Sequence, residues 1–133
     1  MALRTGTRFA VRSAEVFPQG CVFIPGSISE VQDFDENTRA RTPSVDKVTG
    51  LRVWQVRVQD NDETIPAGRS HEVVVKILAD QMPQPPVRGF DLVDFDGLMV
   101  TPYVTDRGRM AYSLRATAVK AARPIPQAGK DAA

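Results

Sequence analysis

Prolines and glycines are the feature that most constrains how this chain can fold. Ten prolines and nine glycines are spread along 133 residues, and no window of 12 residues free of them shows a clean 3.6-residue apolar period. Proline inside a helix removes a hydrogen bond and clashes with the preceding turn, and glycine weakens a helix. The spacing therefore predicts an all-β chain.

Segments with strand character recur between these breaks. β-branched and aromatic residues alternating with polar ones are typical of half-buried strands. The expected strands are 22–34, bent at a glycine, then 51–58, 72–79, 97–104 and 109–119, with a short extra edge strand at 11–17. Such a series of short strands with one long early loop predicts a small five- or six-stranded OB-like barrel.

The connecting segments agree with this prediction. Residues 35–50 read as a long polar loop, and 59–71 read as a hairpin connection. Closely spaced prolines in 80–91 exclude a regular helix between the third and fourth strands, where an OB-fold often has one. TDRG at 105–108 predicts a tight turn with Gly108 at positive φ. We expect one barrel domain over 1–122 and a flexible tail over 123–133.

Composition limits the class of protein. Hydrophobic residues make up 42% and charged residues 25% of the chain, as in soluble globular domains. No apolar run approaches the roughly 20 residues that cross a bilayer, and the N-terminal segment lacks the apolar stretch of a secretory signal. The single cysteine, Cys21, cannot form an internal disulfide. It predicts a small buried residue in a cytoplasmic protein.

The sequence contains no positive signal for an enzyme, a cofactor or a metal. VDFDGL at 93–98 superficially resembles the D-x-D-G segment of haloacid-dehalogenase-type phosphatases, but Leu98 stands where a hydroxyl is needed. An EF-hand loop starting there would need Glu in place of Thr105. His71 is the only histidine, and no activated partner accompanies it. We therefore predict a non-enzymatic protein.

The acidic pair in this segment has a simpler interpretation. Phe95 is expected to pack inward, while Asp94 and Asp96 face water. QDFDE at 32–36 has a similar pattern, and it too predicts a buried aromatic between solvated acids.

Charge is unevenly distributed although the net charge is only +1. Acidic residues gather at 30–36, 60–63 and 91–96. Residues 107–123 contain five basic side chains and no acidic one. Such a chain can present a basic face opposite acidic loops, and a polyanion responds to that local field.

Strand alternation selects the candidate contacts on this basic face. In 109–119, Tyr112 shares the apolar face and is expected in the core, while Arg109 and Arg115 lie on a small polar face suited to phosphates. Those arginines are also compatible with the solvated side of an edge strand, and Trp54 is as compatible with the core as with a stacking platform. The candidate nucleic-acid contacts are Arg52, Trp54, Arg57, Lys76, Tyr103, Arg107, Arg109 and Arg115, with Arg39 and Arg41 as possible loop contacts.

Several segments together carry a family resemblance. They are EVFPQG (15–20), VQDFD (31–35), TGLRVWQVRVQD (49–60), VVVKI (73–77) and FDGLMVTPYV followed by RMAYSLRA (95–116). In these the chain resembles small actinobacterial proteins named plasmid replication, integration and excision activators, the Pra type of integrative conjugative elements. The resemblance implies a role in switching a mobile element into replication and transfer, and it implies no particular mechanism or site residues.

A second, more distant resemblance concerns the last two strands. The segment PYV…GR…RA is similar to the fourth and fifth strands of OB-type single-stranded DNA-binding proteins. That resemblance implies a ligand lying across the second and third strands, between the loops at 35–50 and 105–108.

These observations give a functional expectation and an alternative. The expectation is a single-stranded DNA-binding protein of a plasmid or integrative conjugative element that supports replication, excision or transfer. The alternative is a protein-interaction or transcription-activating module that recruits replication or regulatory partners through an exposed strand edge or acidic loops, without touching DNA. No recognition helix supports a duplex binder. A homodimer through the 11–17 edge strand is compatible with either.

Overall fold

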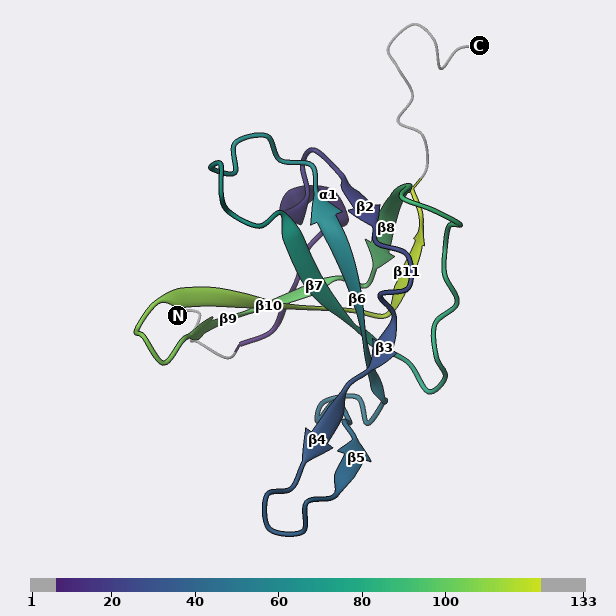
Figure 1. Cartoon of the computed structure of the whole chain (residues 1–133), viewed down its shortest axis with the longest axis vertical. Coiled ribbons are helices and arrows are strands. Elements are labelled where there is room, and N and C mark those ends of the chain that lie inside the picture. Colours follow the sequence, from purple (N-terminus) through teal and green to yellow (C-terminus); the bar gives the residue numbers. More distant parts are fainter. Residues whose placement is uncertain (1–6, 123–133) are drawn as a thin grey trace, which may run out of the picture.

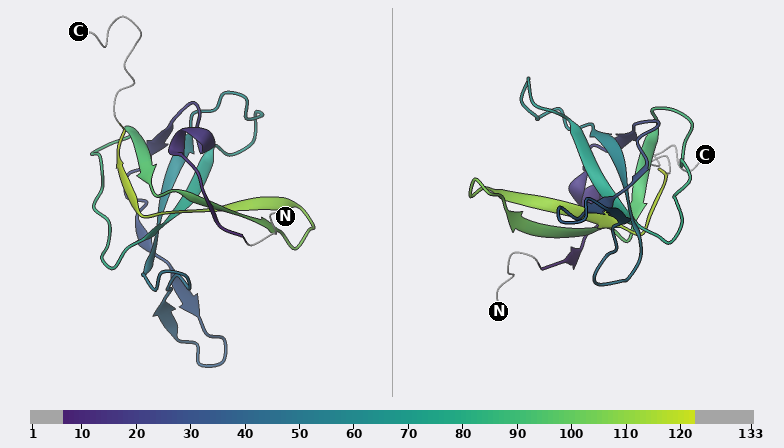
Figure 2. Two further views of the ribbon diagram at one scale, coloured as in Figure 1. Left: turned by 180° about the vertical axis from the view of Figure 1, so that it is seen from behind. Right: turned by 60° about the horizontal axis from the view of Figure 1, so that its bottom comes forward.

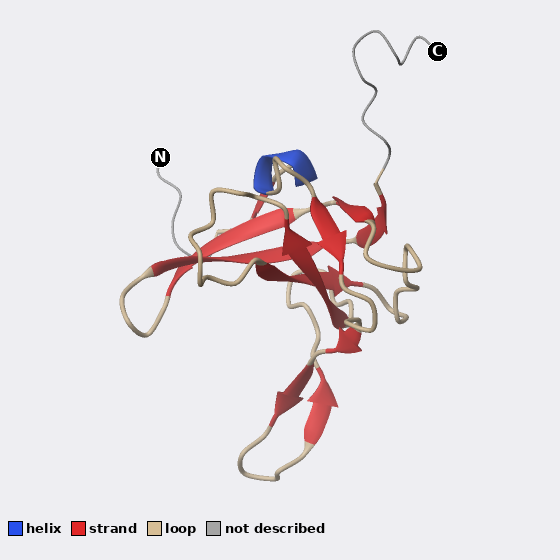
Figure 3. Ribbon diagram, turned by 45° about the horizontal axis from the view of Figure 1, so that its top comes forward, coloured by secondary structure: helices blue, strands red, loops and turns tan. Residues whose placement is uncertain are grey.

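The computed structural model of the chain describes residues 7–122, and its regular structure is almost entirely strand (Figure 3). The one helix in this range is α1 (Ser13–Val16). The strands are β1 (Phe9–Ala10), β2 (Cys21–Phe23), β3 (Ser29–Glu30), β4 (Gln32–Phe34), β5 (Arg41–Pro43), β6 (Val53–Asp60), β7 (Glu72–Leu78), β8 (Leu92–Asp96), β9 (Met99–Val104), β10 (Met110–Ala116) and β11 (Ala118–Ala121). The all-β prediction is confirmed. The tail expected at 123–133 lies outside the described residues.

The strands curl into a small, partly open barrel (Figure 1). β2, β6 and β7 pair antiparallel in succession, and β7 then pairs with β10 in parallel. β10 and β11 pair antiparallel with β9 and β8, and β8 pairs with β2. Because β8 continues into β9 and β10 into β11, these pairings return to the first strand. The architecture is the predicted OB-like barrel.

The long hairpin formed by β8–β9 and β10–β11 therefore belongs both to the barrel wall and to a projection from it. Its halves β8 and β11 form barrel wall, while the ends of β9 and β10 project from the barrel (Figure 1). The bend falls at Gly97, which has φ 61°, and at Thr117 opposite, whose amide donates to the Asp96 carbonyl at 2.9 Å. We call residues 101–113 the second arm. They lie beyond the last pairing of β9 with β1, at Val100.

Another projection, earlier in the chain, leaves the barrel between β3 and β6. β4 and β5 pair antiparallel as a separate two-stranded hairpin. We call residues 32–43 the first arm. Figure 2 shows that the two arms point in different directions from the barrel. Residues 35–50, predicted as a loop, thus contain strand β5 and also a bridge between Val45 and Arg52.

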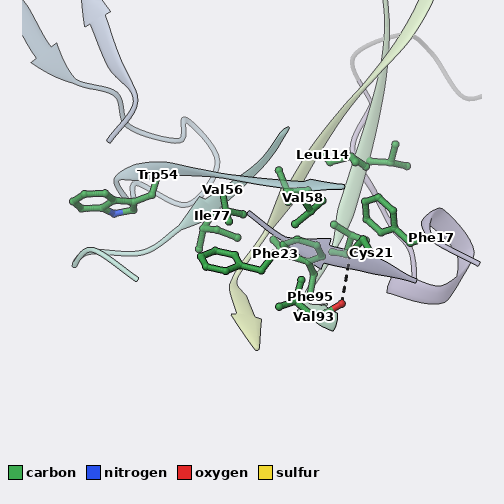
Figure 4. Packing of buried hydrophobic residues seen from close by; sticks show 14 residues of the cluster. Phe17, Cys21, Phe23, Trp54, Val56, Val58, Ile77, Val93, Phe95 and Leu114 are labelled. Atoms are coloured by element: carbon green, nitrogen blue, oxygen red, sulfur yellow. Dashed lines mark hydrogen bonds between the residues drawn. The ribbon is translucent and has the colours of Figure 1, made fainter. Parts of the chain in front are cut away.

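The core fills the barrel with side chains from β2, β6, β7, β8, β9 and β10 (Figure 4), and Val119 of β11 packs against it. Val56, Val58 and Val75 are fully buried, as alternation through the central parts of β6 and β7 requires. Cys21 is also fully buried, as predicted, and its thiol lies 3.6 Å from the Val93 carbonyl. Burial raises the pKa of this thiol to about 12, so it stays protonated at neutral pH.

The short helix corrects one prediction. Residues 11–17 were expected to form an edge strand, but they contain the single turn α1. The Arg12 amide donates to the Glu15 carboxylate at 2.8 Å, which stabilises the start of the turn. Phe17 then packs in the core against the Phe95 ring, with centroids 6.1 Å apart. This segment is therefore no strand edge for a dimer.

Two predicted strands are divided by local geometry. The segment 22–34 forms β2, β3 and β4 instead of one bent strand, because a turn at Pro25–Gly26 interrupts pairing. The segment 109–119 forms β10 and β11, divided at Thr117. Strand β8, which precedes the predicted strand 97–104 and is separated from it by the bend at Gly97, was not predicted. The hairpin connection 59–71, the absence of a helix in 80–91 and the positive φ of Gly108, 76°, are confirmed.

Within residues 7–122, no helix has the length and apolar character to cross a membrane.

Candidate nucleic-acid interface

The outer face of β6 and β7 forms the surface between the two arms. Alternation turns Gln55 and Arg57 of β6 away from the core, and the register pairs them with Lys76 and Val74 of β7. The parallel pairing of β7 with β10 then places Arg115 beside Lys76. The predicted outward direction of Lys76 is thus confirmed, and a row of polar side chains crosses three strands.

Trp54 and Arg52 do not belong to this face. Both lie on the core side of β6, two and four positions from Val56, and Trp54 is only 7% exposed. Its indole N–H donates to the Ala79 carbonyl at 2.9 Å, and the Arg52 guanidinium lies 4.7 Å from the ring centre. Arg52 also pairs with Glu30. Trp54 is therefore a core residue and no open stacking platform, since period-two alternation separates it from Arg57.

Arg57 lies on the outer face, but its charge is compensated. Its guanidinium contacts the Glu72 carboxylate at 3.0 Å, with both side chains about half exposed. Exposed pairs of this kind contribute little to stability. A phosphate that approached Arg57 would compete with Glu72 for the guanidinium.

Arg115 is held by a buried acid. Asp46, in the segment between β5 and β6, is 3% exposed and accepts hydrogen bonds from Arg8 at 2.7 Å and from Arg115 at 3.2 Å. Its other oxygen accepts from the amide and hydroxyl of Thr49. The hydrogen bonds from Arg8, followed by those from Thr49, hold the pKa of the Asp46 carboxyl well below its usual range. Arg115 thus fixes this segment against β10 while keeping about a quarter of its side chain exposed.

A groove of about 380 Å³ lies where β7 and the second arm separate. Lys76 and Tyr103, two of the predicted contacts, both line it, together with Tyr112 and Ser113. Lys76 has no ion pair within residues 7–122. Burial and the neighbouring Arg115 lower the pKa of the Lys76 ammonium. The Asp33 carboxylate on the first arm opposes this shift, and an anion in the groove would oppose it further.

The second arm combines cations with exposed aromatic rings. Arg107 and Arg109 are exposed at its tip, and neither has an ion pair within the described range. Tyr103 is 43% and Tyr112 65% exposed. The prediction that Tyr112 packs in the core is wrong, because β10 reaches the barrel only after this residue, and of its side chains only Leu114 and Ala116 are buried in the core.

The first arm has a similar composition with a different charge. Phe34 is 54% exposed, and the Arg41 guanidinium lies 5.8 Å from its ring centre. Phe34 was expected to be buried like Phe95, but β4 lies on the arm and Phe95 on the barrel wall. The arm carries three acids against two arginines, Arg39 and Arg41, so it offers a ring more than a positive field.

The residues considered for catalysis or metal binding have ordinary surroundings. His71 Nδ1 lies 3.2 Å from the Asp60 carbonyl oxygen, and Asp96 pairs with Lys120 at 2.6 Å. Phe95 is 5% exposed, as expected for the residue between two acids. Residues 7–122 contain no group of three or more His, Cys, Asp and Glu arranged to hold a metal ion.

The predicted contacts thus divide among separate places. The outer face and groove bring together Lys76, Arg115, Arg57 and Tyr103. Arg107 and Arg109 lie at the tip of the second arm, and Arg39 and Arg41 lie on the first arm. Trp54 is in the core, and the partly exposed Arg52 covers its ring. Sequence reasoning missed Phe34 and Tyr112. Both alternate with polar neighbours in the same way as core residues, so only their positions on the arms distinguish them.

Comparisons with family models, curated proteins and solved structures find no match to the chain.

Proposed function

We propose that this protein binds single-stranded DNA on the outer face of β6 and β7, between the two arms. The observation that carries the proposal is the second arm, which places exposed Tyr103 and Tyr112 on the same short hairpin as Arg107 and Arg109. Single-strand binders combine these two chemistries, because cations neutralise phosphates while aromatic planes stack on unpaired bases.

The OB-like barrel supports this location. In such barrels, oligonucleotides lie across the second and third strands between the loops that flank them. Here those strands are β6 and β7, and the flanking loops are the two arms. Phe34 and Tyr103 offer stacking surfaces at either side, and Lys76 offers an ammonium between them.

The charge pattern favours a flexible strand over a duplex. The cations of the proposed interface lie on two thin projections, on the outer face and in a groove, instead of on one broad basic surface. A single strand can follow such a path and stack its bases along it. The short α1, with four residues, is no recognition helix for a major groove.

The resemblance to Pra-type proteins supports a role on a plasmid or integrative conjugative element, where replication, excision and transfer expose single strands. The single, buried, protonated Cys21 supports a cytoplasmic location, where thiols stay reduced.

The test is a polarisation titration with labelled oligothymidine at several salt concentrations. Replacing Arg107 and Arg109 together by Ala should weaken binding and reduce the slope of log affinity against log salt by about 1.4, because each phosphate contact on a single strand contributes about 0.7.

Arg88→Ala is a control that removes one surface charge outside the proposed interface. Arg88 is exposed and belongs to the 79–91 connection, which runs on the side of the barrel away from the second arm (Figure 1). It should leave the slope unchanged. Absence of oligothymidine binding at low salt, or equal slopes for the double variant and the control, would refute the proposal.

A further inference from the structure

The two strands that border the groove share only a short ladder. β7 and β10 pair at Lys76–Arg115 and Ile77–Ala116, whereas β7 pairs with β6 along its whole length. From this base the strands diverge, β7 along the barrel and β10 into the second arm (Figure 1). We call the space between Glu72–Val74 and 110–114 the fork.

The register shows which backbone groups face the fork. Successive residues of an antiparallel strand direct their N–H and C=O groups to opposite sides. The Thr105 amide bonds to the Arg109 carbonyl, so odd-numbered residues of β10 face β9, and Met110 and Tyr112 face the fork. The Ala79 amide bonds to the Arg52 carbonyl, so Val74 faces the fork from the other side. None of these three residues has a strand partner there within residues 7–122.

The other edge of the second arm is protected. Val11 donates to the Leu98 carbonyl, so even-numbered residues of β9 direct their backbone away from β10. Pro102 occupies the open part of this edge and has no N–H to donate. Proline is a common device for preventing strand addition at an edge. β10 has no proline, so its fork edge remains able to pair.

Side chains around the fork suit an extended peptide. Val74 is 40% exposed on the outer face of β7, and Met110 and Tyr112 are 57% and 65% exposed on the face of β10 that carries Leu114, so apolar side chains flank the unpaired backbone on both faces. Lys76 lines the groove at the closed end of the fork without an ion pair in the described range. The Glu72 carboxylate at the open end is already paired with Arg57. The charges around the fork therefore favour a ligand with one negative charge, placed next to Lys76.

We infer that the fork is a docking site for an extended segment of a partner protein, which adds as a strand to the open edge of β10. Its backbone pairs with Met110 and Tyr112, its apolar side chains cover the groove, and a carboxylate at one end meets the Lys76 ammonium. In this mode of recognition, main-chain hydrogen bonds supply affinity and the side-chain contacts supply specificity. The inference does not depend on DNA binding.

The experiment uses labelled heptapeptides of alternating valine and threonine. Two of them carry an aspartate, one at the first position and one at the last. Two matched peptides carry a lysine at the same positions. One aspartate peptide should bind the full chain at least about tenfold more tightly than its lysine counterpart, which is the range of a charge-assisted hydrogen bond. The position of the preferred aspartate reports the direction of the added strand.

Two substitutions at one position separate backbone from side chain. Tyr112→Pro removes the N–H that faces the fork and spares the ladder to β9, while Tyr112→Ala keeps that N–H. The proline variant should bind at least about tenfold more weakly than the alanine variant. Lys76→Glu should reverse the preference to the lysine peptide, and this result does not depend on how well Tyr112→Pro folds.

Equal affinity for aspartate and lysine peptides, or equal weakening by the two Tyr112 variants, would overturn the inference. If neither peptide binds while Lys76→Glu weakens oligothymidine, the fork belongs to nucleic acid. If neither binds and sedimentation shows a dimer that Tyr112→Pro abolishes, the fork belongs to a second copy of this chain. Loss of oligothymidine binding in Arg107→Ala/Arg109→Ala with unchanged peptide affinity would leave the inference standing.

Discussion

The Asp46 carboxylate both stabilises the fold and neutralises two arginine side chains. It is buried and accepts hydrogen bonds from Arg8, Arg115 and Thr49. Asp46→Asn should lower the free energy of unfolding by about 2–3 kcal/mol, because charge-assisted hydrogen bonds are lost at a buried site. The same change frees the Arg8 and Arg115 guanidinium groups, the second of which lies beside Lys76, so oligothymidine affinity should rise. Chemical denaturation and polarisation titration measure the two opposite effects.

Acid pH offers a control for this prediction. The lowered pKa of Asp46 means that its contribution is present above the unfolded-state value, about 4, and is lost as pH falls through the folded-state value. The difference in stability between wild type and Asp46→Asn should therefore shrink between pH 5 and the most acid pH that preserves the fold. A difference independent of pH would mean that the ionised carboxylate is not what stabilises this segment.

Trp54 and Tyr103 should respond in opposite ways to substitution. Trp54→Phe loses the hydrogen bond to Ala79 and should cost about 1–2 kcal/mol of stability with oligothymidine affinity unchanged. Tyr103→Ala should reduce affinity by about 1–3 kcal/mol, the range of one base stack, and change stability by less than about 1 kcal/mol. Paired denaturation and binding curves decide this, and a large loss of affinity in Trp54→Phe would reverse the assignment.

Residue type and alternation predict some side-chain roles better than others. Cys21, Phe95 and Lys76 have the environments that the sequence predicts, because each lies in a strand of the barrel wall where period-two alternation applies. Phe34 and Tyr112 do not. Their strands continue beyond the barrel, and a local pattern contains no information about where the opposing wall ends.

The bend between β8 and β9 is the element on which the second arm depends. Gly97 has φ 61°, and a Cβ built there would lie 2.7 Å from the Thr117 hydroxyl oxygen. Gly97→Ala should destabilise the protein by about 1–3 kcal/mol through backbone strain and this clash. Thermal or chemical denaturation followed by Trp54 fluorescence measures the change.

Two further variants separate the causes. Gly89→Ala has open space and no positive φ, so it should stay within about 0.5 kcal/mol of wild type. Adding Thr117→Ala to Gly97→Ala removes the clash and leaves the strain, so part of the loss should be recovered relative to the sum of the single variants. Strict additivity would exclude a steric contribution at this bend.

Secondary-structure elements could be predicted where the strand propensity of the sequence agrees with the strand pairing in the fold. β6, β7 and the hairpin between them follow the sequence closely, since alternating valines have one consistent apolar face. The turn at 13–16 was not, because a four-residue helix is too short to show a period. The division of 22–34 and the β4–β5 hairpin depend on contacts with β6 and on the arm geometry, which local sequence does not encode.

At the scale of the whole molecule, the barrel was predictable from the number and spacing of strands, while its two arms were not. Strand count and short connections limit the topology to a few small barrels. Whether a strand ends at the wall or continues past it depends on the length of its neighbours, and β10 extends well beyond the Lys76–Ile77 segment of β7 with which it pairs.

Hydrogen exchange should reveal the division between wall and arm. Amides of Ala111 and Ser113 face β9 and should be protected, while those of Met110 and Tyr112 face the fork and should exchange quickly. Val56, in the centre of β6, serves as the slow reference. Residue-resolved exchange by NMR measures this alternation. Uniformly slow exchange across 110–113 would show that the fork edge is covered.

The continuity of wall and arm in one bent hairpin has an entropic consequence. A binding loop tethered by two flexible joints loses conformational freedom when it grips a ligand, and that loss subtracts from affinity. Here the tip arginines are carried by strands that continue into the barrel wall as β8 and β11, so much of that freedom is already lost when the chain folds. A ligand thus meets a second arm whose orientation is already fixed by folding. A more flexible bend at Gly97 and Thr117 would therefore weaken binding without removing any contact to the ligand.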